Sequence, residues 1–123
     1  MQDYRKLDVW NRSHLFTLKV YQITRGFPPD EKYGLVSQLR RASASVPANL
    51  AEGCGRSSST ELARFAEIAH GSASEAEYHL LLSQDLGYLP DQSHVELSRE
   101  IAEIKRMLGG LIRRLRDGKP SKN

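Results

Sequence analysis

Apolar and small residues recur at helical spacing in four separate segments of the chain. The clearest row lies in the last segment and alternates intervals of four and three residues, through Leu97, Ile101, Ile104, Leu108, Leu111 and Leu115. A row with this spacing is typical of the buried face of a helix in a bundle. Ser93 followed by Glu96 has the pattern of a capping box, which predicts where this helix begins.

The first segment predicts a helix from about Leu7 to Arg25, with Asp8 as a possible cap. One face of this helix carries Trp10, Ser13, Thr17, Val20, Tyr21 and Thr24. The helix is expected to stop at Gly26, because Phe27-Pro28-Pro29 cannot easily continue it.

The second helix is expected to begin near Asp30 and Glu31, where acidic side chains suit the positive end of the helix dipole. Its apolar stripe is Leu35, Leu39, Ala42, Val46, Leu50 and Gly53. The stripe passes straight through Pro47, which favours one helix kinked at Pro47 although a proline costs about 3 kcal/mol in a helix interior. The alternative is two helices, the second capped by Ser45.

Ser58 and Glu61 form a capping box that predicts the start of a third helix, which runs to about Leu86 and ends at Gly87. One face of this helix carries Leu62, Phe65, Ala69, Ser72, Ala76, Leu80 and Ser83, and small residues there allow a neighbouring helix to approach closely. Short connections force neighbouring helices to be antiparallel. The sequence therefore predicts an all-α, up-down-up-down four-helix bundle over residues 1–117, followed by a flexible basic tail over 118–123.

Composition adds a charge asymmetry to this picture. The formal net charge is only +3, but residues 99–123 hold eight Lys and Arg against three Asp and Glu. A basic end of this kind permits an anionic partner. No apolar run approaches the ~18 residues of a membrane span, and the N-terminus does not have the pattern of a secretory signal. The single cysteine, Cys54, fits a reducing compartment, so a cytoplasmic protein is expected.

Two groups of arginines are candidates for phosphate contact. On the last helix, Arg106 and Arg113 are seven residues apart and share a face with Arg99; Arg114, Arg116 and Lys105 lie on the same helix. This stripe could follow a nucleic-acid backbone. It could equally be basic residues placed favourably at a helix C-terminus.

The second group is Arg40 and Arg41, on the second helix before Pro47, with Arg56 in the loop that follows. Arg40 and Arg41 could be solvated, paired with acids such as Glu52 or Glu75 within the subunit or across an interface, or in contact with phosphate. Asn49 lies beside the apolar stripe, and a carbonyl freed by Pro47 could satisfy its amide locally.

Metal and enzyme chemistry find little support. Glu67 and His70 form one Glu-x-x-His pair, whereas a carboxylate-bridged di-metal site in a bundle needs two such pairs. His79 follows Glu75 by four residues, which predicts a surface pair. Cys54 has no histidine placed beside it, although Arg56 could lower its pKa somewhat. No enzyme activity, metal or cofactor is expected.

Several segments resemble one known family. They are Gln38-Leu39-Arg40-Arg41-Ala42, Val46-Pro47-Ala48-Asn49-Leu50-Ala51-Glu52-Gly53 with Arg56, Leu7-Asp8-Val9-Trp10, Phe27-Pro28 with Glu31, Ala69-His70-Gly71-Ser72 with Glu75, and Leu86-Gly87-Tyr88-Leu89. They resemble the bacterial four-helix bundle proteins first noticed as products of intervening sequences in large-subunit ribosomal RNA genes. The resemblance implies a homopentamer of antiparallel bundles around a central channel, with no catalytic residues.

A related protein is the accessory variability determinant of diversity-generating retroelements, a pentameric bundle with a basic surface that works beside a reverse transcriptase and its template RNA. The expectation is therefore a non-enzymatic homopentamer that binds nucleic acid, RNA above all, through Arg106, Arg113, Arg114, Arg116, Arg40, Arg41 and Arg56. Structural or interface roles are expected for Pro47, Asn49, Glu52, Gly53, Gly71, Ser72 and Glu75. The alternative is a protein-interaction scaffold that assists a reverse transcriptase or a ribosome-associated partner.

Overall fold

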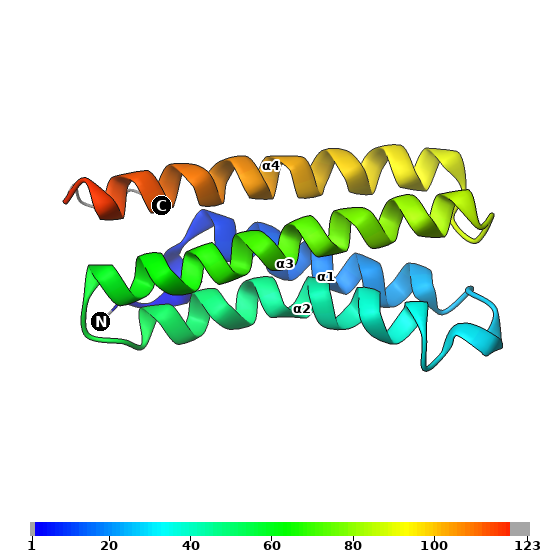
Figure 1. Ribbon diagram of the computed structural model, residues 1–123, viewed down its shortest axis with the longest axis horizontal. Helices are drawn as coiled ribbons and strands as arrows, with labels where there is room; N and C mark the ends of the chain where they lie inside the picture. The colour runs from blue at the N-terminus through cyan, green and yellow to red at the C-terminus, as the bar shows by residue number, and fades with distance from the viewer. Residues whose placement is uncertain (1, 119–123) are drawn as a thin grey trace.

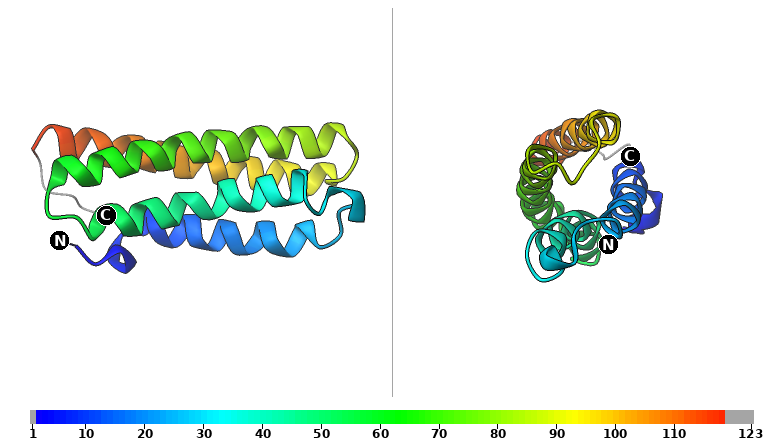
Figure 2. Two further views of the ribbon diagram at one scale, coloured as in Figure 1. Left: turned by 60° about the horizontal axis from the view of Figure 1, so that its bottom comes forward. Right: turned by 90° about the vertical axis from the view of Figure 1, so that its right-hand side faces the viewer.

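The computed structural model describes residues 2–118, and all regular elements in that range are helices. They are η1 (Tyr4–Lys6), α1 (Asp8–Thr24), η2 (Pro29–Glu31), α2 (Leu35–Cys54), α3 (Ser59–Asp85) and α4 (Asp91–Arg116). The four long helices run antiparallel, with the α1–α2 and α3–α4 connections at one end and the α2–α3 loop at the other (Figure 1). Seen end-on, α1 and α3 lie on opposite sides of the bundle (Figure 2). The predicted four-helix bundle is confirmed.

The core is built from the apolar faces that the sequence pattern indicated. All six members of the leucine and isoleucine row on α4 are buried, and they are the whole buried set of that helix. Leu39, Val46 and Leu50 of α2 and Leu80 of α3 are also almost fully buried. Tyr21, on the predicted face of α1, is 42% exposed, whereas Ser13, Thr17, Val20 and Thr24 of the same face are buried.

The second helix runs without a break from Leu35 to Cys54 with Pro47 inside it, so the alternative of two separate helices is wrong. Proline lacks the N–H that would bond to the carbonyl of Ser43. That carbonyl lies 3.1 Å from Oγ1 of Thr17 on α1. The same hydroxyl lies 2.8 Å from the carbonyl of Ser13, so its one proton serves two acceptors. A neighbouring helix thus supplies the donor that Pro47 removes. The kink at Pro47 stays a prediction.

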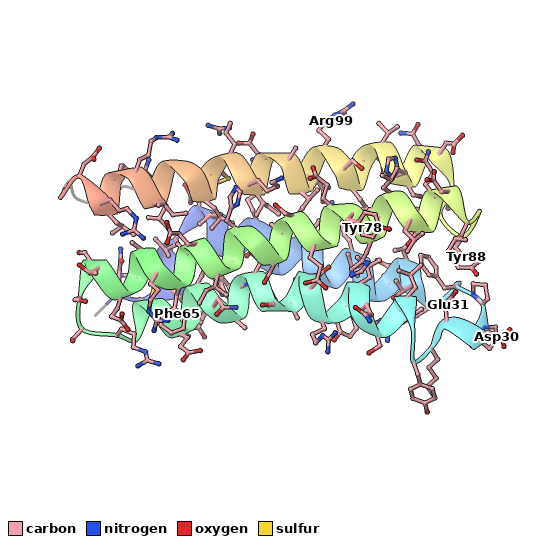
Figure 3. All side chains as sticks on the ribbon, viewed as in Figure 1. Asp30, Glu31, Phe65, Tyr78, Tyr88 and Arg99 are labelled. Atoms are coloured by element: carbon pink, nitrogen blue, oxygen red, sulfur yellow. The ribbon has the colours of Figure 1, made fainter. Side chains whose placement is uncertain are left out.

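Two predicted helix starts are wrong. α2 begins at Leu35, and the acidic residues expected to open it lie in η2 instead. The reason lies in Glu31, whose carboxylate accepts from the Leu35 N–H at 3.2 Å and from the Tyr88 hydroxyl at 3.1 Å. Glu31 therefore caps α2 from outside the helix and ties it to the α3–α4 connection; Figure 3 shows Glu31 and Tyr88 close together at this end.

The capping box of Ser93 and Glu96 is the second wrong start, because α4 begins at Asp91 directly after Pro90. Pro90 already has φ −58°, and Asp91 lies in the first turn, where an acid suits the helix dipole. Similarly, Asp8 is the first residue of α1 rather than its cap, which is Leu7 without a side-chain hydrogen bond.

The predicted start of α3 is confirmed, since Oγ of Ser58 accepts from the Glu61 N–H at 3.2 Å. The carboxylate of Glu61 bonds Arg64, and the helix ends at Asp85, before Gly87 at φ +80°. Of the predicted tail over 118–123, residues 119–123 lie outside the described part of the chain. Within residues 2–118, no helix has the length and apolar character needed to cross a membrane.

Candidate nucleic-acid interface

Arg99, Arg106 and Arg113 are exposed on α4 at seven-residue intervals, and we call this row the α4 stripe. Figure 3 shows Arg99 pointing away from the bundle. Arg106 is already paired, because its Nε donates to Glu103 at 3.0 Å and its Nη2 makes a second, shorter contact. The hydrogen bond from Arg106 lowers the pKa of Glu103 below its ordinary value. Within the described chain, Arg99 and Arg113 have no carboxylate at ion-pair distance.

Two further cations of α4 fasten the helix to α3. Nη2 of Arg116 lies 2.7 Å from Oε1 of Glu67, and Nζ of Lys105 lies 3.0 Å from Oε1 of Glu77. Glu67 therefore forms an ion pair with Arg116, and it is not free to bind a metal ion together with His70. Because a phosphate would have to displace these carboxylates, Arg116 and Lys105 are less available to it than Arg113.

Arg114 differs from its neighbours because part of its guanidinium is buried. Its Nε has no hydrogen-bond partner among the described residues. The side chain folds back over Gly110, where an added Cβ would lie 3.3 Å from Nη1 of Arg114. Leaving a buried donor unbonded costs about 1–3 kcal/mol, so this N–H favours an acceptor from water or a ligand. Arg99 and Arg113 are therefore the α4 arginines most free to meet phosphate, and Arg114 is unpaired but partly buried.

On α2, Arg40 is tied to α1. Its Nε donates to Oγ1 of Thr24 at 2.8 Å, its Nη2 donates to the carbonyl of Tyr21 at 3.1 Å, and its guanidinium carbon lies 4.6 Å from the centre of the Tyr21 ring. Pairing of Arg40 with an acid of the same subunit, one of the readings above, is therefore wrong. All of these partners are neutral, so the positive charge of Arg40 is not compensated by a carboxylate and can attract an anion. Arg41 is exposed and bonds to no described residue.

Arg56 lies at the opposite end of α2. Its Nη2 pairs with Oε2 of Glu52 at 2.8 Å, and its guanidinium carbon lies 5.0 Å from the ring centre of Phe65. Arg64 lies 4.5 Å from the same ring, which Figure 3 places near the α2–α3 loop. Phe65 thus gathers two arginines, each already paired with a carboxylate.

Two of the residues expected to be structural join α2 to α3 within one subunit. Nδ2 of Asn49 donates to the carbonyl and to Oγ of Ser45, at 2.8 and 2.9 Å. Oγ of Ser45 lies 2.9 Å from Oγ of Ser72 on α3. The local satisfaction of Asn49 is confirmed, although the acceptor is Ser45 and not the carbonyl that Pro47 frees, which Thr17 takes.

The two glycines expected to be structural have opposite surroundings. An added Cβ at Gly53 would lie 2.9 Å from both Leu62 Cδ1 and Phe65 Cβ, whereas one at Gly71 would meet nothing within 4 Å. Gly53 therefore permits close approach of α3. Glu75 is exposed and pairs with His79 at 3.2 Å, as predicted. Interface roles for Gly71, Glu52 and Glu75 stay predictions.

The sequence interpretation missed one feature, a groove along α2 that we call the α2 groove. It is lined by Tyr21, Lys32, Tyr33, Arg40, Arg41, Ala44 and their neighbours, none of them acidic. The available signal was the pair Lys32-Tyr33, a cation and an aromatic residue in a turn just before a helix that carries two arginines. Their proximity to Tyr21 depends on the pairing of α1 with α2 and could not be read from spacing alone.

The cysteine thiol and the potential metal ligands do not form a reactive site in the described part of the chain. Burial raises the pKa of the Cys54 thiol, so the lowering expected from Arg56 is wrong: the cost of desolvating a thiolate is the larger effect. Among residues 2–118, no three His, Cys, Asp or Glu side chains are grouped as the ligands of a metal ion would be.

Comparisons with known proteins agree on the architecture. Residues 5–110 match the family described as 23S rRNA-intervening sequence protein. A solved structure of a Bacteroides thetaiotaomicron protein of unknown function, from the S23 ribosomal protein family, superimposes with a TM-score of 0.76 at 22% identity, covering 85% of this chain and 97% of that one. A search of curated proteins found no match. The family match spans most of the sequence, and the chain therefore belongs to the 23S rRNA-intervening sequence protein family.

Proposed function

We propose that this protein is a non-enzymatic, homopentameric helical bundle that binds nucleic acid, RNA above all, through the basic surfaces of α4 and α2. The observation that carries the proposal is a set of arginines without carboxylate partners in the described chain: Arg41 on α2 and Arg99, Arg113 and Arg114 on α4. Such cations can replace the counterions of a phosphate backbone without first breaking an internal ion pair. The family resemblance favours RNA as the polyanion.

Exposed apolar side chains support self-association. Leu15 and Leu18 of α1 are 56% and 52% exposed, and Ile68, Tyr78 and Leu81 of α3 are exposed as well. Because α1 and α3 lie on opposite sides of the bundle (Figure 2), the α1 face of one copy can meet the α3 face of the next. Unlike faces that meet through a closed rotation generate a ring. The basic surfaces of α2 and α4 stay uncovered in such a ring, and the number five comes from the resemblance.

Light scattering coupled to size exclusion tests both the pentameric assembly and the RNA binding. The measurement is made with and without mixed-sequence RNA, at low and at physiological salt. We expect a mass five times the 13.9 kDa of one chain, and a shift with RNA that is lost as salt rises. A monomer would overturn the ring. A pentamer indifferent to RNA would overturn the nucleic-acid assignment.

The double variant Arg99→Glu with Arg113→Glu locates the binding surface. We expect it to weaken RNA binding and reduce the shift while the mass stays unchanged, because both side chains are exposed and have no described carboxylate partner. The matched control is Arg5→Glu with Lys6→Glu, which makes the same change of net charge at two exposed residues of η1. If both double variants bind RNA like the wild type, the α4 stripe is not the site.

The second candidate is a protein-interaction scaffold that assists a reverse transcriptase or a ribosome-associated partner. It is favoured by the pairing of Arg56, Arg106 and Arg116 with carboxylates, which removes much of the free positive charge of the surface. This candidate predicts an RNA-indifferent oligomer that forms a tight complex with one protein.

A further inference from the structure

The α2 groove is open to solvent and has a volume of about 630 Å³, within the roughly 300–1,000 Å³ of ligand sites. It begins at the turn before α2 and continues along the outer face of that helix, with α1 contributing Tyr21. Three cations, Lys32, Arg40 and Arg41, and two tyrosines line it together with small residues such as Ala44. The groove therefore combines positive charge, aromatic rings and room for a chain to pass.

Its charge is not compensated locally. Arg40 is held by a hydroxyl and a carbonyl, and Arg41 has no partner among the described residues. Glu31 is the acid closest in sequence to Lys32, and its two oxygens already accept from the Leu35 N–H and the Tyr88 hydroxyl. Because no acidic residue lines the groove, an anion in it meets three positive charges and no repulsion from the lining side chains.

The tyrosines distinguish between anions. Tyr33 is 87% exposed, with Nζ of Lys32 5.4 Å from its ring centre, and Tyr21 is fixed beneath the guanidinium of Arg40. Aromatic rings beside cations are the arrangement by which proteins hold unpaired bases, since each base stacks on a ring while its phosphate meets a cation. In a duplex the base faces are already stacked on one another, so they are not available to Tyr33.

We propose that the α2 groove binds single-stranded nucleic acid, with a base stacked on Tyr33 and phosphates on Lys32, Arg40 and Arg41. This inference rests on the proposed function for its class of ligand, but it places the selective contacts on α2 rather than on α4. An acidic peptide could use the same cations; it would gain nothing from the ring faces, and it is an outcome of the test.

The experiment measures fluorescence anisotropy of a labelled, mixed-sequence RNA of about 12 nucleotides, against a blunt RNA duplex of equal length. We expect Tyr33→Ala to raise Kd for the single strand by about tenfold, the loss of roughly one stacked base, and Tyr33→Phe to bind like the wild type. Arg41→Ala should lower the slope of log K against log salt by about 0.7. Circular dichroism confirms that each variant stays folded.

The matched controls are Leu86→Ala, an exposed apolar residue at the C-terminal end of α3 outside the groove, and Lys6→Ala, an exposed cation of η1. Both should leave binding unchanged. Three results would overturn the inference: Tyr33→Ala binding like the wild type, duplex binding as tightly as single strand, or release of the RNA by polyglutamate of equal charge. RNA binding that responds to Arg113→Glu but not to Tyr33→Ala would leave the proposed function standing without the groove; no RNA binding at all would overturn both.

Discussion

The joint between α2 and α3 and the inner face of α4 hold the same bundle together by different means. On α4 the buried set is a row of six leucines and isoleucines with no polar member. At the α2–α3 joint, Gly53 lies against Leu62 and Phe65, and the hydroxyls of Ser45 and Ser72 meet at 2.9 Å. One surface is stabilised by apolar area, the other by close approach and matched polar atoms.

The difference predicts how each surface responds to change. The free energy gained by burying apolar surface does not depend on orientation and scales with the area removed from water. The α4 row should therefore be destabilised when side-chain volume is removed and should tolerate apolar substitutions that keep the volume. The α2–α3 joint has the opposite sensitivity, because an added methyl at Gly53 has no space. Mutations that remove atoms from α4 and mutations that add atoms to α2 therefore test the comparison from both sides.

Leu108→Ala should have the largest effect. Leu108 is fully buried at the centre of the α4 row, and we expect the free energy of unfolding to fall by about 3 kcal/mol. The measurement is urea unfolding at one fixed protein concentration, because association of subunits couples to stability. Leu86→Ala, at an exposed leucine where α3 ends, is the control and should change stability much less. Equal effects at the two positions would contradict the assignment of the α4 row as the main apolar support.

Gly53→Ala should have the next largest effect, lowering the free energy of unfolding by about 2 kcal/mol. Its Cβ would lie 2.9 Å from two carbon atoms of α3, so the helices must separate or strain. Gly71→Ala is the matched variant, since it makes the same chemical change inside a helix where nothing lies within 4 Å. There we expect a gain of about 0.5–1 kcal/mol from helix propensity. Urea unfolding of both variants should give opposite signs, and the same sign in both would contradict the close approach at Gly53.

The same contrast explains how much the sequence could predict. The α4 row and the core stripe of α2 follow from periodicity alone, because buried apolar faces must repeat at helical spacing. The starts of α2 and α4 did not follow, since Glu31 caps α2 from outside the helix and Pro90 opens α4. The orientation of Glu31 also depends on the hydroxyl of Tyr88, a contact between distant segments that a local pattern does not contain. Pro90 before Asp91 is a local signal, but the capping-box pattern at Ser93 predicts a later start.

Candidate functional residues divide in the same way. The α4 stripe was visible as a seven-residue repeat of arginines. The α2 groove was not, because Tyr21 reaches Arg40 only when α1 pairs with α2. The carboxylate partners of Arg116 and Lys105 also come from another helix, so their lower availability could not be predicted from α4 alone.

Thr17→Val should lower the free energy of unfolding by about 1–2 kcal/mol. Valine keeps the shape of threonine but removes the hydroxyl that serves the Ser43 carbonyl, which then stays buried without the donor that Pro47 also lacks. Thr17→Ser is the control, because it keeps the hydroxyl. Urea unfolding should place the serine variant between the valine variant and the wild type. A valine variant as stable as the wild type would mean that the freed carbonyl finds another donor.

Arg116→Gln should have the smallest effect. We expect the free energy of unfolding to fall by about 0–1 kcal/mol, and by less as salt is raised. Arg116 and Glu67 are each about half exposed, and solvent screens such a pair while the two long side chains lose freedom in forming it. Arg113→Gln is the control, since that arginine has no described carboxylate partner. A loss well above 1 kcal/mol for Arg116→Gln would mean that α4 depends on its ion pairs as well as on its apolar row. A small loss leaves the apolar row as the main support, and it frees the arginines of α4 to be replaced one by one in binding experiments without unfolding the bundle.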